Sequence, residues 1–390
     1  MGASFHLQAA GVVGAAVLGI WLHLFFGRGW FWRIRSVDRE EILTPSDWPS
    51  VVAVVPARNE EETIGRAVTS LLHQDYPGKF HVVIVDDESE DSTASVAAQV
   101  AADFRAEDRL RVERVSARPE GWTGKLWALR MGVAGSEQDP PAFFWFTDAD
   151  VTHAPDTLRR LVAQAQQRQL DLTSLMVLLQ TKTFPERALI PAFLYFFLML
   201  YPPRWIADDE LRTAGAAGGC VLLKREAFAR IGGFEAIRSE VIDDCALARA
   251  VKNTRGRVWM STTRTSESLR AYRTFAEIRD LIARTAFTQL RYSTLLLAGT
   301  VFAMILTYGA PVALLFTHDF SARILGAVAL LLMTLSFAPA VRFYRLSLLW
   351  APLLPLAALF YTYSTWVSAV RYWLGHGGQW KGRAQAPKGS

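Results

Sequence analysis

Long apolar stretches lie near both ends of the chain, with a mixed, charged region between them. Residues 7–26 contain no Asp, Glu, Lys or Arg, and about 20 apolar residues are enough to cross the hydrocarbon core as a helix. Three more predominantly apolar stretches occupy residues 295–316, 322–341 and 346–370. The pattern predicts about four membrane crossings, with a soluble domain between the first and the second.

The first apolar stretch has the features of a membrane anchor. A secretory signal peptide is the alternative, but it would have basic residues before its apolar run. Here Arg28, Arg33 and Arg35 follow the run. Because basic residues gather on the cytoplasmic side of a span, we expect the chain after residue 28 to begin inside the cell.

The topology of the chain's end stays open. Four crossings from an outside N-terminus return the tail to the outside, whereas Lys381, Arg383 and Lys388 favour the inside. Pro352 and Pro355 would reconcile the two if they broke the last stretch into a re-entrant hairpin.

A further apolar stretch, residues 188–206, contains Pro191, Pro202 and Pro203 and ends in aromatic residues beside an Arg. It has two interpretations, a buried core helix and a helix that lies in the headgroup layer. The aromatic and basic end suits the headgroup layer, so we favour the interfacial helix.

Composition excludes several classes of protein. The 390 residues are 51% hydrophobic and 12% aromatic, which is too apolar for a disordered chain. The net charge of +5 is modest and much of it flanks the apolar stretches, so we expect no nucleic acid partner. The two cysteines, Cys220 and Cys245, exclude a disulfide scaffold, and Cys245 is expected to be a small packed hydrophobe.

The middle of the chain alternates short apolar runs with amphipathic stretches. The runs cover residues 51–56, 81–85, 110–115 and 143–147, and residues 62–72 have apolar side chains at helical spacing. Unbroken apolar strands separated by helices predict an α/β fold with a parallel sheet covered on both faces. Ligands of such sheets bind beyond the carboxyl ends of the strands.

Acidic residues follow three of these strands. Glu60 comes after the first, Asp86 and Asp87 after the second, and Asp148-Ala149-Asp150 after the fourth. No glycine-rich phosphate loop follows the first strand, which argues against nicotinamide cofactors and simple NTP hydrolysis. In an extended segment the two Asp148-Ala149-Asp150 carboxylates would point the same way and reach one Mg²⁺ or Mn²⁺. The sequence therefore predicts a nucleotide held through a divalent cation.

Several of these motifs also have a purely structural interpretation. Asn59 with Glu62 would form a helix capping box. Asp86 and Asp87 would form a turn, with Ser89 and Asp91 capping the next helix. We expect His153 to be a solvated histidine at a helix start.

Taken together, PARNEE, VDDESEDST, the Asp148-Ala149-Asp150 motif and DDCAL resemble the family 2 glycosyltransferases of GT-A fold. The order of one leading span, a catalytic domain and C-terminal spans is similar to the ceramide glucosyltransferase-like group. GWTGKLWAL, DDCALA and the closing WKGR resemble the hopanoid-biosynthesis-associated glycosyltransferases of bacteria. The resemblance runs from about residue 50 to the end of the chain.

The resemblance implies a role for each matching residue. The general base would be Asp244, and Mg²⁺ or Mn²⁺ would be held by Asp148 and Asp150. The acceptor would meet Gly219, Asp243 and Tyr292. A UDP-sugar donor would be bound by the following residues: Pro56, Arg58, Glu60, Asp86, Asp87, Lys125, Asp148 and Arg291.

Three positions depart from the family's usual motifs. Asp243 stands where Glu is usual, and in the Gln/Arg-x-x-Arg-Trp motif Thr288 and Tyr292 replace the first and last residues. The altered neighbours of Arg291 weaken a processive-synthase interpretation. Gly219 is equally well explained by a tight turn into a strand, and Trp380 to Arg383 either anchors at the membrane surface or folds back to the site.

The resemblance implies a multi-pass protein of the bacterial inner membrane with a cytoplasmic catalytic domain. It would transfer a sugar with inversion from a UDP-sugar to a hydroxyl of a membrane lipid, a hopanoid or another lipid. We expect a membrane anchor at 1–36, a GT-A domain at 45–292, transmembrane helices at 293–373 and a basic tail at 374–390. Two alternatives stay open, a polyprenyl-phosphate glycosyltransferase and a catalytically silent scaffold.

Overall fold

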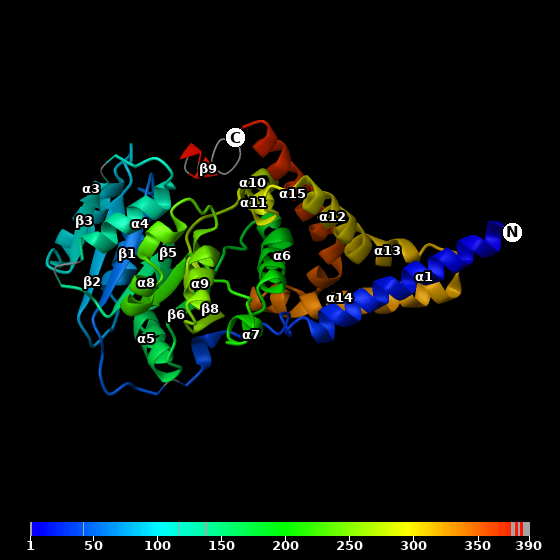
Figure 1. Cartoon of the computed structure of the whole chain (residues 1–390), viewed down its shortest axis with the longest axis horizontal. Coiled ribbons are helices and arrows are strands. Elements are labelled where there is room, and N and C mark those ends of the chain that lie inside the picture. Colours follow the sequence, from blue (N-terminus) through cyan, green and yellow to red (C-terminus); the bar gives the residue numbers. More distant parts are fainter. Residues whose placement is uncertain are drawn as a thin grey trace. The chain divides into compact units, whose positions relative to one another are not determined.

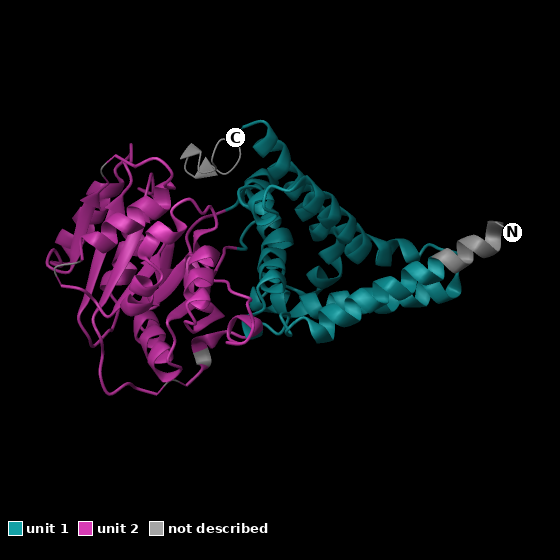
Figure 2. Ribbon diagram, viewed as in Figure 1, with its two compact units in different colours: residues 1–34, 181–204, 272–377 teal, residues 35–180, 205–271, 378–390 magenta. Residues whose placement is uncertain are grey.

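The chain packs as two units in the computed structural model (Figure 2), which describes residues 2–41, 43–115, 117–136, 139–375, 379–380 and 383–384. Unit 1 comprises residues 1–34, 181–204 and 272–377, and unit 2 comprises residues 35–180, 205–271 and 378–390. The helix expected inside the GT-A domain at 188–206 therefore packs mainly in unit 1, as does the segment from 272 to 292.

Unit 2 is built on an eight-stranded sheet with the order β3-β2-β1-β4-β7-β6-β8-β5 (Figure 1). The strands are β1 Val51–Ala57, β2 Phe80–Asp86, β3 Leu110–Arg114, β4 Phe143–Thr147, β5 Val151–His153, β6 Leu172–Leu178, β7 Cys220–Lys224 and β8 Val258–Ser268. The four apolar runs in the first half of the chain are thus strands, as predicted. Residues 379–380 (β9) and 383–384 (β10) form a separate antiparallel pair.

The sheet is mixed rather than wholly parallel. β3, β2, β1 and β4 run parallel to one another, whereas β7 lies antiparallel between β4 and β6. Ala57 at the end of β1 pairs with Asp86 at the end of β2. The residues that follow β1, β2 and β4 therefore meet at one edge of the sheet, which is the edge where parallel sheets bind their ligands.

Helices pack against this sheet because each has one apolar face. In α2 the buried residues include Ile64, Val68 and Leu71, at the spacing of a single helix face. The helices of unit 2 are α2 Ile64–Leu72, α3 Thr93–Asp103, α4 Gly124–Ala134, α5 Thr157–Gln167, α8 Arg225–Arg230 and α9 Asp243–Asn253, with 3₁₀ turns at Val37–Arg39 and Gly233–Ile237; the short α7 Pro203–Ile206 joins the two units.

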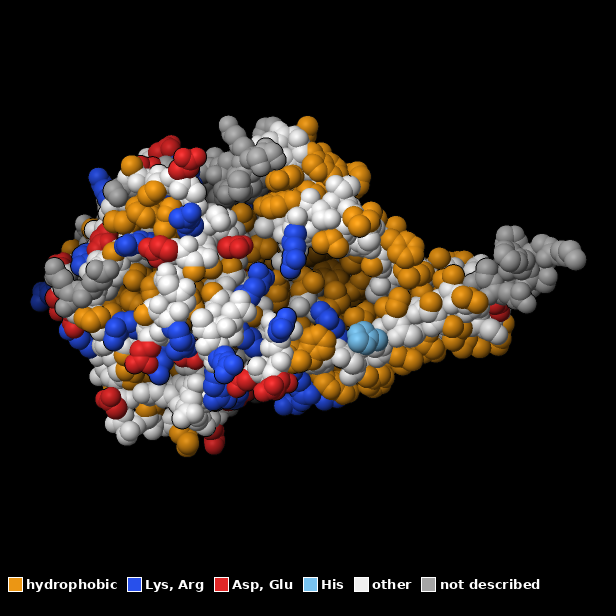
Figure 3. Space-filling model, in the orientation of Figure 1, with side chains coloured by type: hydrophobic (Ala, Val, Ile, Leu, Met, Phe, Trp, Pro, Cys, Tyr) orange, Lys and Arg blue, Asp and Glu red, His pale blue; other side chains and the backbone are white. Residues whose placement is uncertain are grey.

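Unit 1 consists of apolar helices. They are α1 Gly2–Leu22 with a π-turn at His23–Gly27, α6 Phe184–Leu200, α10 Phe275–Ala283, α11 Ala286–Gln289, α12 Thr294–Met304 with a π-turn at Ile305–Gly309, α13 Ala310–Leu314, α14 Phe320–Phe343, a 3₁₀ segment Leu348–Leu353 and α15 Leu354–Trp373. Figure 3 shows apolar side chains over much of their surface, and Leu295 and Phe316 are each 82% exposed. Exposed apolar area of this extent marks a surface that contacts a membrane or another protein.

Five helical segments in the described part of the chain are long and apolar enough to cross a membrane. Four of them, Ala10–Gly27, Thr294–Leu314, Phe320–Phe343 and Leu348–Trp373, coincide with the predicted spans, and the fifth is Phe184–Ile206. The last span continues as one helix from Leu354 to Trp373. The re-entrant hairpin is therefore wrong: Pro352 lies in the 3₁₀ segment and Pro355 in the first turn of α15, where proline is compatible with a helix.

The segment around α6 is a buried helix rather than the expected interfacial helix. In the 18-residue window by which Phe184–Ile206 qualifies as apolar, 61% of the residues are buried. Tyr361 of α15 donates a hydrogen bond to the Leu189 carbonyl (3.0 Å), and the Tyr195 and Ser336 hydroxyls are 2.9 Å apart. The helix cannot be a full crossing, because the chain before it (β6) and after it (β7) pairs in one sheet.

Substituting Gly132 tests the packing of α4 against the sheet. A Cβ atom at Gly132 would lie 2.5 Å from Val54 Cγ1 and 2.8 Å from Val85 Cγ2. We expect Gly132→Ala to lower the free energy of unfolding by about 1–3 kcal/mol, the usual cost of overpacking a core, measured as faster hydrogen–deuterium exchange in β1 and β2. Gly299→Ala is the control, since a Cβ there meets no atom within 4 Å; equal exchange in both variants would contradict the packing.

Candidate active site

Two loops at the carboxyl edge of the sheet, residues 58–63 after β1 and residues 87–92 after β2, are tied together by hydrogen bonds. The buried Arg58 guanidinium donates to the carbonyls of Asp87 (2.5 Å) and Glu88 (3.0 Å). Asn59 Oδ1 accepts from the Glu90 amide (2.9 Å). The alternative interpretation of Asn59 and Glu62 as a capping box is therefore wrong, because α2 begins only at Ile64 and Asn59 bonds to the neighbouring loop.

Two acidic residues at this edge of the sheet are buried: Asp86, the last residue of β2, and Asp87, which follows it. Asp86 is 4% exposed and Asp87 is fully buried. Asp86 Oδ1 accepts a hydrogen bond from the Ser89 amide (3.3 Å), so this residue does shape the turn. Glu60 Oε2 accepts from the Thr63 hydroxyl (3.0 Å). Asp91 Oδ1 accepts from the amide of Thr93 (3.0 Å), the first residue of α3, whereas Ser89 accepts from the Asn59 amide (3.0 Å) and does not cap this helix.

The Asp148-Ala149-Asp150 motif lies in a turn, not in an extended segment. β4 ends at Thr147 and β5 begins at Val151, and the Val151 amide donates to the Asp148 carbonyl (3.2 Å). The argument from strand alternation is therefore wrong here. Asp148 lines a pocket, and Asp150 is not among the residues that line it.

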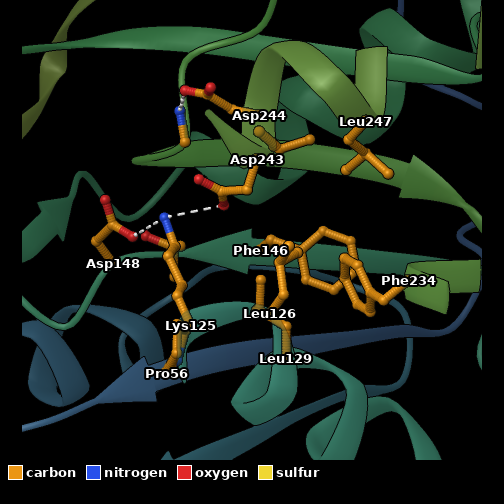
Figure 4. A pocket seen from close by; sticks show the side chains of 13 residues that line it. Pro56, Lys125, Leu126, Leu129, Phe146, Asp148, Phe234, Asp243, Asp244 and Leu247 are labelled. Atoms are coloured by element: carbon orange, nitrogen blue, oxygen red, sulfur yellow. Dashed lines mark hydrogen bonds and ion pairs between the residues drawn. The ribbon is translucent and has the colours of Figure 1, made fainter. Parts of the chain in front are cut away.

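Lys125 lines this pocket, with its ammonium between the carboxylates of Asp148 and Asp243 (Figure 4). Its Nζ is 2.9 Å from Asp148 Oδ1 and 3.3 Å from Asp243 Oδ2. Lys125 stands in the first turn of α4, which starts after the N-cap residue Thr123, whose hydroxyl accepts from the Leu126 amide (3.4 Å). Burial alone would lower the pKa of Lys125, but the carboxylates of Asp148 and Asp243 raise it above its usual value, so the ammonium is charged.

Asp244 is held by backbone donors beside the ammonium. Its Oδ2 accepts from the Gly218 amide (2.8 Å) and its Oδ1 from the Cys245 amide (2.7 Å). Burial and the neighbouring Asp243 raise the pKa of Asp244 to about 6, against the opposing effect of Lys125 and the two amides. A carboxylate with this pKa is largely ionised at neutral pH and is poised to accept a proton.

Gly218 allows the loop before β7 to approach both charged groups. A Cβ atom at this position would lie 3.2 Å from Lys125 Nζ and 3.3 Å from Asp244 Oδ2. Gly219, the residue named from the sequence, contributes its carbonyl, which accepts from the Thr147 hydroxyl (2.9 Å). The turn into β7 was predicted, but the residue that lines the pocket is Gly218 rather than Gly219.

The pocket has one charged and one apolar side (Figure 4). Asp148, Lys125, Asp243 and Asp244 form the charged side. The residues that complete the lining are mostly apolar, and they are Pro56, Leu126, Leu129, Phe146, Thr147, Gly218, Val221, Phe234 and Leu247. Pro56 brings the end of β1 into the site, as expected, and the apolar wall was not predicted.

His153 is buried, which contradicts the expected solvated histidine. It is 5% exposed in β5, with Nε2 2.8 Å from the Thr147 hydroxyl and Nδ1 2.8 Å from the Ser266 hydroxyl. Burial lowers its pKa to about 3, so the ring is neutral. Since the Thr147 hydroxyl donates to Gly219, it accepts from Nε2–H of His153. Both ring nitrogens are engaged, and His153 supports the turn around Asp148 rather than binding a ligand.

The charges of the pocket fit a divalent cation. Three carboxylates face one ammonium, which leaves a formal charge of −2 among Asp148, Asp243, Asp244 and Lys125. In the described part of the chain no three His, Cys, Asp or Glu side chains form a metal-binding group. A Mg²⁺ or Mn²⁺ ion here would take most of its oxygen ligands from a diphosphate and from water. Asp148, whose side chain is 36% exposed, suits that arrangement.

Arg291 and Tyr292 belong to unit 1, and their roles stay predictions. Both have positive φ angles, 52° and 57°. Tyr292 stacks on Tyr372 with ring centroids 4.3 Å apart. Its hydroxyl accepts from that of Thr288 (3.1 Å), the residue that replaces Gln or Arg in the expected motif.

Part of the chain is similar in sequence to known proteins. Residues 52–232 match the family model "Glycosyl transferase family 2". This segment, a little under half of the chain, is similar to family 2 glycosyltransferases. It contains the loops after β1 and β2, Lys125, Asp148 and Gly218, whereas Asp243 and Asp244 lie just beyond it.

Two groups of curated relatives match part of this chain. A beta-monoglucosyldiacylglycerol synthase of Synechocystis sp. is 39% identical over 116 residues, which is 30% of this chain and 22% of the relative. A 4,4'-diaponeurosporenoate glycosyltransferase of Staphylococcus aureus is 29% identical over 205 residues, 52% of this chain and 51% of the relative. The chain thus spans between a fifth and a half of these relatives.

The fold is the GT-A-like α/β fold. The mannosyltransferase PcManGT from Pyrobaculum calidifontis, solved with GDP-Man and Mn²⁺, superposes with a TM-score of 0.60 and 19% identity. The match covers 93% of this chain and 99% of that one. The likeness extends over nearly the whole length of both chains and establishes the fold alone.

Replacing Asp243 tests the electrostatic origin of the Asp244 pKa. If Asp244 is the base, turnover should fall as the pH drops through about 6, because the protonated carboxyl cannot accept a proton. Asp243→Asn removes a negative neighbour, so the pKa of Asp244 and the acidic midpoint of kcat/KM should move to lower pH. The measurement is the pH profile of both proteins, and an unchanged midpoint would contradict the assignment.

Proposed function

We propose that the protein is a membrane-bound, inverting, metal-dependent glycosyltransferase that moves one sugar from a UDP-sugar to the hydroxyl of a membrane lipid. The observation that carries the proposal is the cluster of Lys125, Asp148, Asp243 and Asp244 at the carboxyl edge of a GT-A-like sheet. The family 2 segment and the two groups of relatives named for lipids support it.

Asp244 is the proposed general base. A lipid hydroxyl has a pKa far above neutrality, so a carboxylate must take its proton as the oxygen attacks the anomeric carbon. The two amide donors hold the Asp244 carboxylate in one orientation. With one base and no second carboxylate as nucleophile, the attack is a single displacement, and the configuration at the anomeric carbon inverts.

The remaining polar residues are assigned to the donor. Glu60, Asp86 and Asp87, in the loops that Arg58 ties together, would contact the base and ribose. Lys125, together with Arg291, would face the diphosphate. A divalent cation bound at Asp148 and Asp150 would neutralise charge on the departing diphosphate. Gly219, Asp243 and Tyr292 are assigned to the acceptor.

The membrane helices account for the type of acceptor. A lipid headgroup stays at the bilayer surface, so a transferase that uses it has to be held at the membrane. We place unit 2 on the cytoplasmic side of the bacterial inner membrane, because Arg28, Arg33 and Arg35 follow the first span. Hopanoids or their precursors are the proposed acceptor lipids, on the resemblance of GWTGKLWAL, DDCALA and WKGR. The basic tail that carries WKGR lies largely outside the described residues.

Nucleotide release tests the proposal. Detergent-purified protein with Mn²⁺ or Mg²⁺ would be given a panel of UDP-sugars, with GDP-mannose included, with and without a hopanoid-containing lipid extract. We expect lipid-stimulated release with one donor and a loss of at least about 100-fold in Asp244→Asn, the usual range for removing a general base. Asp139→Asn is the matched control, because Asp139 is an exposed carboxylate paired with Lys79.

The other outcomes distinguish the alternatives. Substantial turnover in Asp244→Asn would favour a phosphate acceptor such as a polyprenyl phosphate, which needs no strong base. No release with any donor, metal or lipid would contradict a transferase and favour a catalytically silent scaffold.

A further inference from the structure

Lys125 is the positively charged residue of the pocket, and its ammonium lies between two negatively charged carboxylates. Its ammonium contacts Asp148 at 2.9 Å and Asp243 at 3.3 Å, and its side chain is only 18% exposed. These two carboxylates come from different segments, the turn after β4 and the first turn of α9. One ammonium therefore neutralises part of the charge of both segments.

A divalent cation at Asp148 would meet this ammonium at close range. An ion bound to the Asp148 carboxylate would lie within a few ångströms of Lys125 Nζ, since Nζ is 2.9 Å from Oδ1 of the same carboxylate. Like charges at such distances repel strongly in a partly buried site. Lys125 and the cation therefore compete for the negative charge of Asp148, and the binding of one weakens the binding of the other.

We propose that Lys125 is an internal counter-ion that competes with the divalent cation for Asp148 and leaves Asp148 when a nucleoside diphosphate enters the pocket. This inference rests on the proposed function of the site. Without a nucleotide, Lys125 holds Asp148 and Asp243 together and weakens the binding of a free cation. The diphosphate provides a new partner for the ammonium, and Asp148 then becomes available to the cation.

The proposal predicts coupling between metal and nucleotide. A site whose binding-competent state is rarely populated has a reduced apparent affinity. A nucleotide that stabilises that state raises the affinity for the metal, and by linkage the metal raises the affinity for the nucleotide by the same factor. A lysine that only binds phosphate would leave the affinity for metal alone unchanged on its removal.

Two features of the pocket allow the ammonium of Lys125 to move. Gly218 leaves space beside Nζ, since a Cβ there would be 3.2 Å away. Asp244 is held by its two amide donors and stays in place when the ammonium leaves. The base and the counter-ion are therefore positioned by different groups.

Mn²⁺ binding measures the competition directly. Full-length protein in detergent is titrated with Mn²⁺, free Mn²⁺ is followed by electron paramagnetic resonance, and the titration is repeated with saturating UDP. In Lys125→Gln we expect Mn²⁺ alone to bind at least about fivefold more tightly than in the wild type. We expect the gain in affinity on adding UDP to shrink by a similar factor.

Two further variants keep the test decisive. Lys125→Arg retains the charge, so its affinity for Mn²⁺ alone should stay within about twofold of the wild type. Arg130→Gln, on the same helix but outside the pocket and paired with Glu235, is the control for a lost positive charge and should change neither titration. Melting temperatures of all variants report on folding.

Three results would overturn the inference. Unchanged binding of Mn²⁺ alone in Lys125→Gln, with weaker binding beside UDP, would reduce Lys125 to a phosphate ligand. Tighter Mn²⁺ binding in Arg130→Gln would point to a general charge effect. No Mn²⁺ binding to the wild type, with or without UDP, would remove both the inference and the metal dependence proposed above. Metal-dependent nucleotide release by the wild type separates the first two results from a failure of the proposed function.

Discussion

The ion pairs of Lys125 are the interaction on which the site depends. They join α4 to the turn after β4 and to the start of α9, two segments that carry three of the acidic residues. Without a cation between them, Asp148, Asp243 and Asp244 would repel one another in a partly buried pocket. The ammonium thus stabilises an arrangement of like charges that a metal-dependent reaction on a diphosphate also requires.

The pairing of the strands positions these charged side chains. Parallel pairing of β1 with β2 and β4 brings the ends of the three strands to one edge. The antiparallel β7 then places Gly218 against Asp244, and the chain Ser266–His153–Thr147–Gly219 joins the turn after β4 to the same loop. Asp244 is buried in this arrangement, and burial together with the neighbouring Asp243 raises its pKa to about 6.

Much of this architecture could be predicted because it depends on local sequence. Four strands and α2 follow from unbroken apolar runs and helical spacing, and Lys125, Asp148 and Asp244 follow from motifs. The antiparallel pairing of β7 could not be predicted, since its partner strands β4 and β6 lie far away in the chain. His153 was misjudged because β5 has three residues and shows no periodicity. The turn at Asp148-Ala149-Asp150 and the burial of α6 depend on tertiary packing that spacing does not encode.

A structure of the protein with UDP and Mn²⁺ in a lipid nanodisc tests the central claim most directly. The account predicts a cation at Asp148, a diphosphate beside Lys125 Nζ, and an ammonium that has left Asp148 while Asp244 keeps both of its amide donors. A nucleotide bound away from this pocket, or a Lys125 that still pairs with Asp148 beside bound metal, would contradict it.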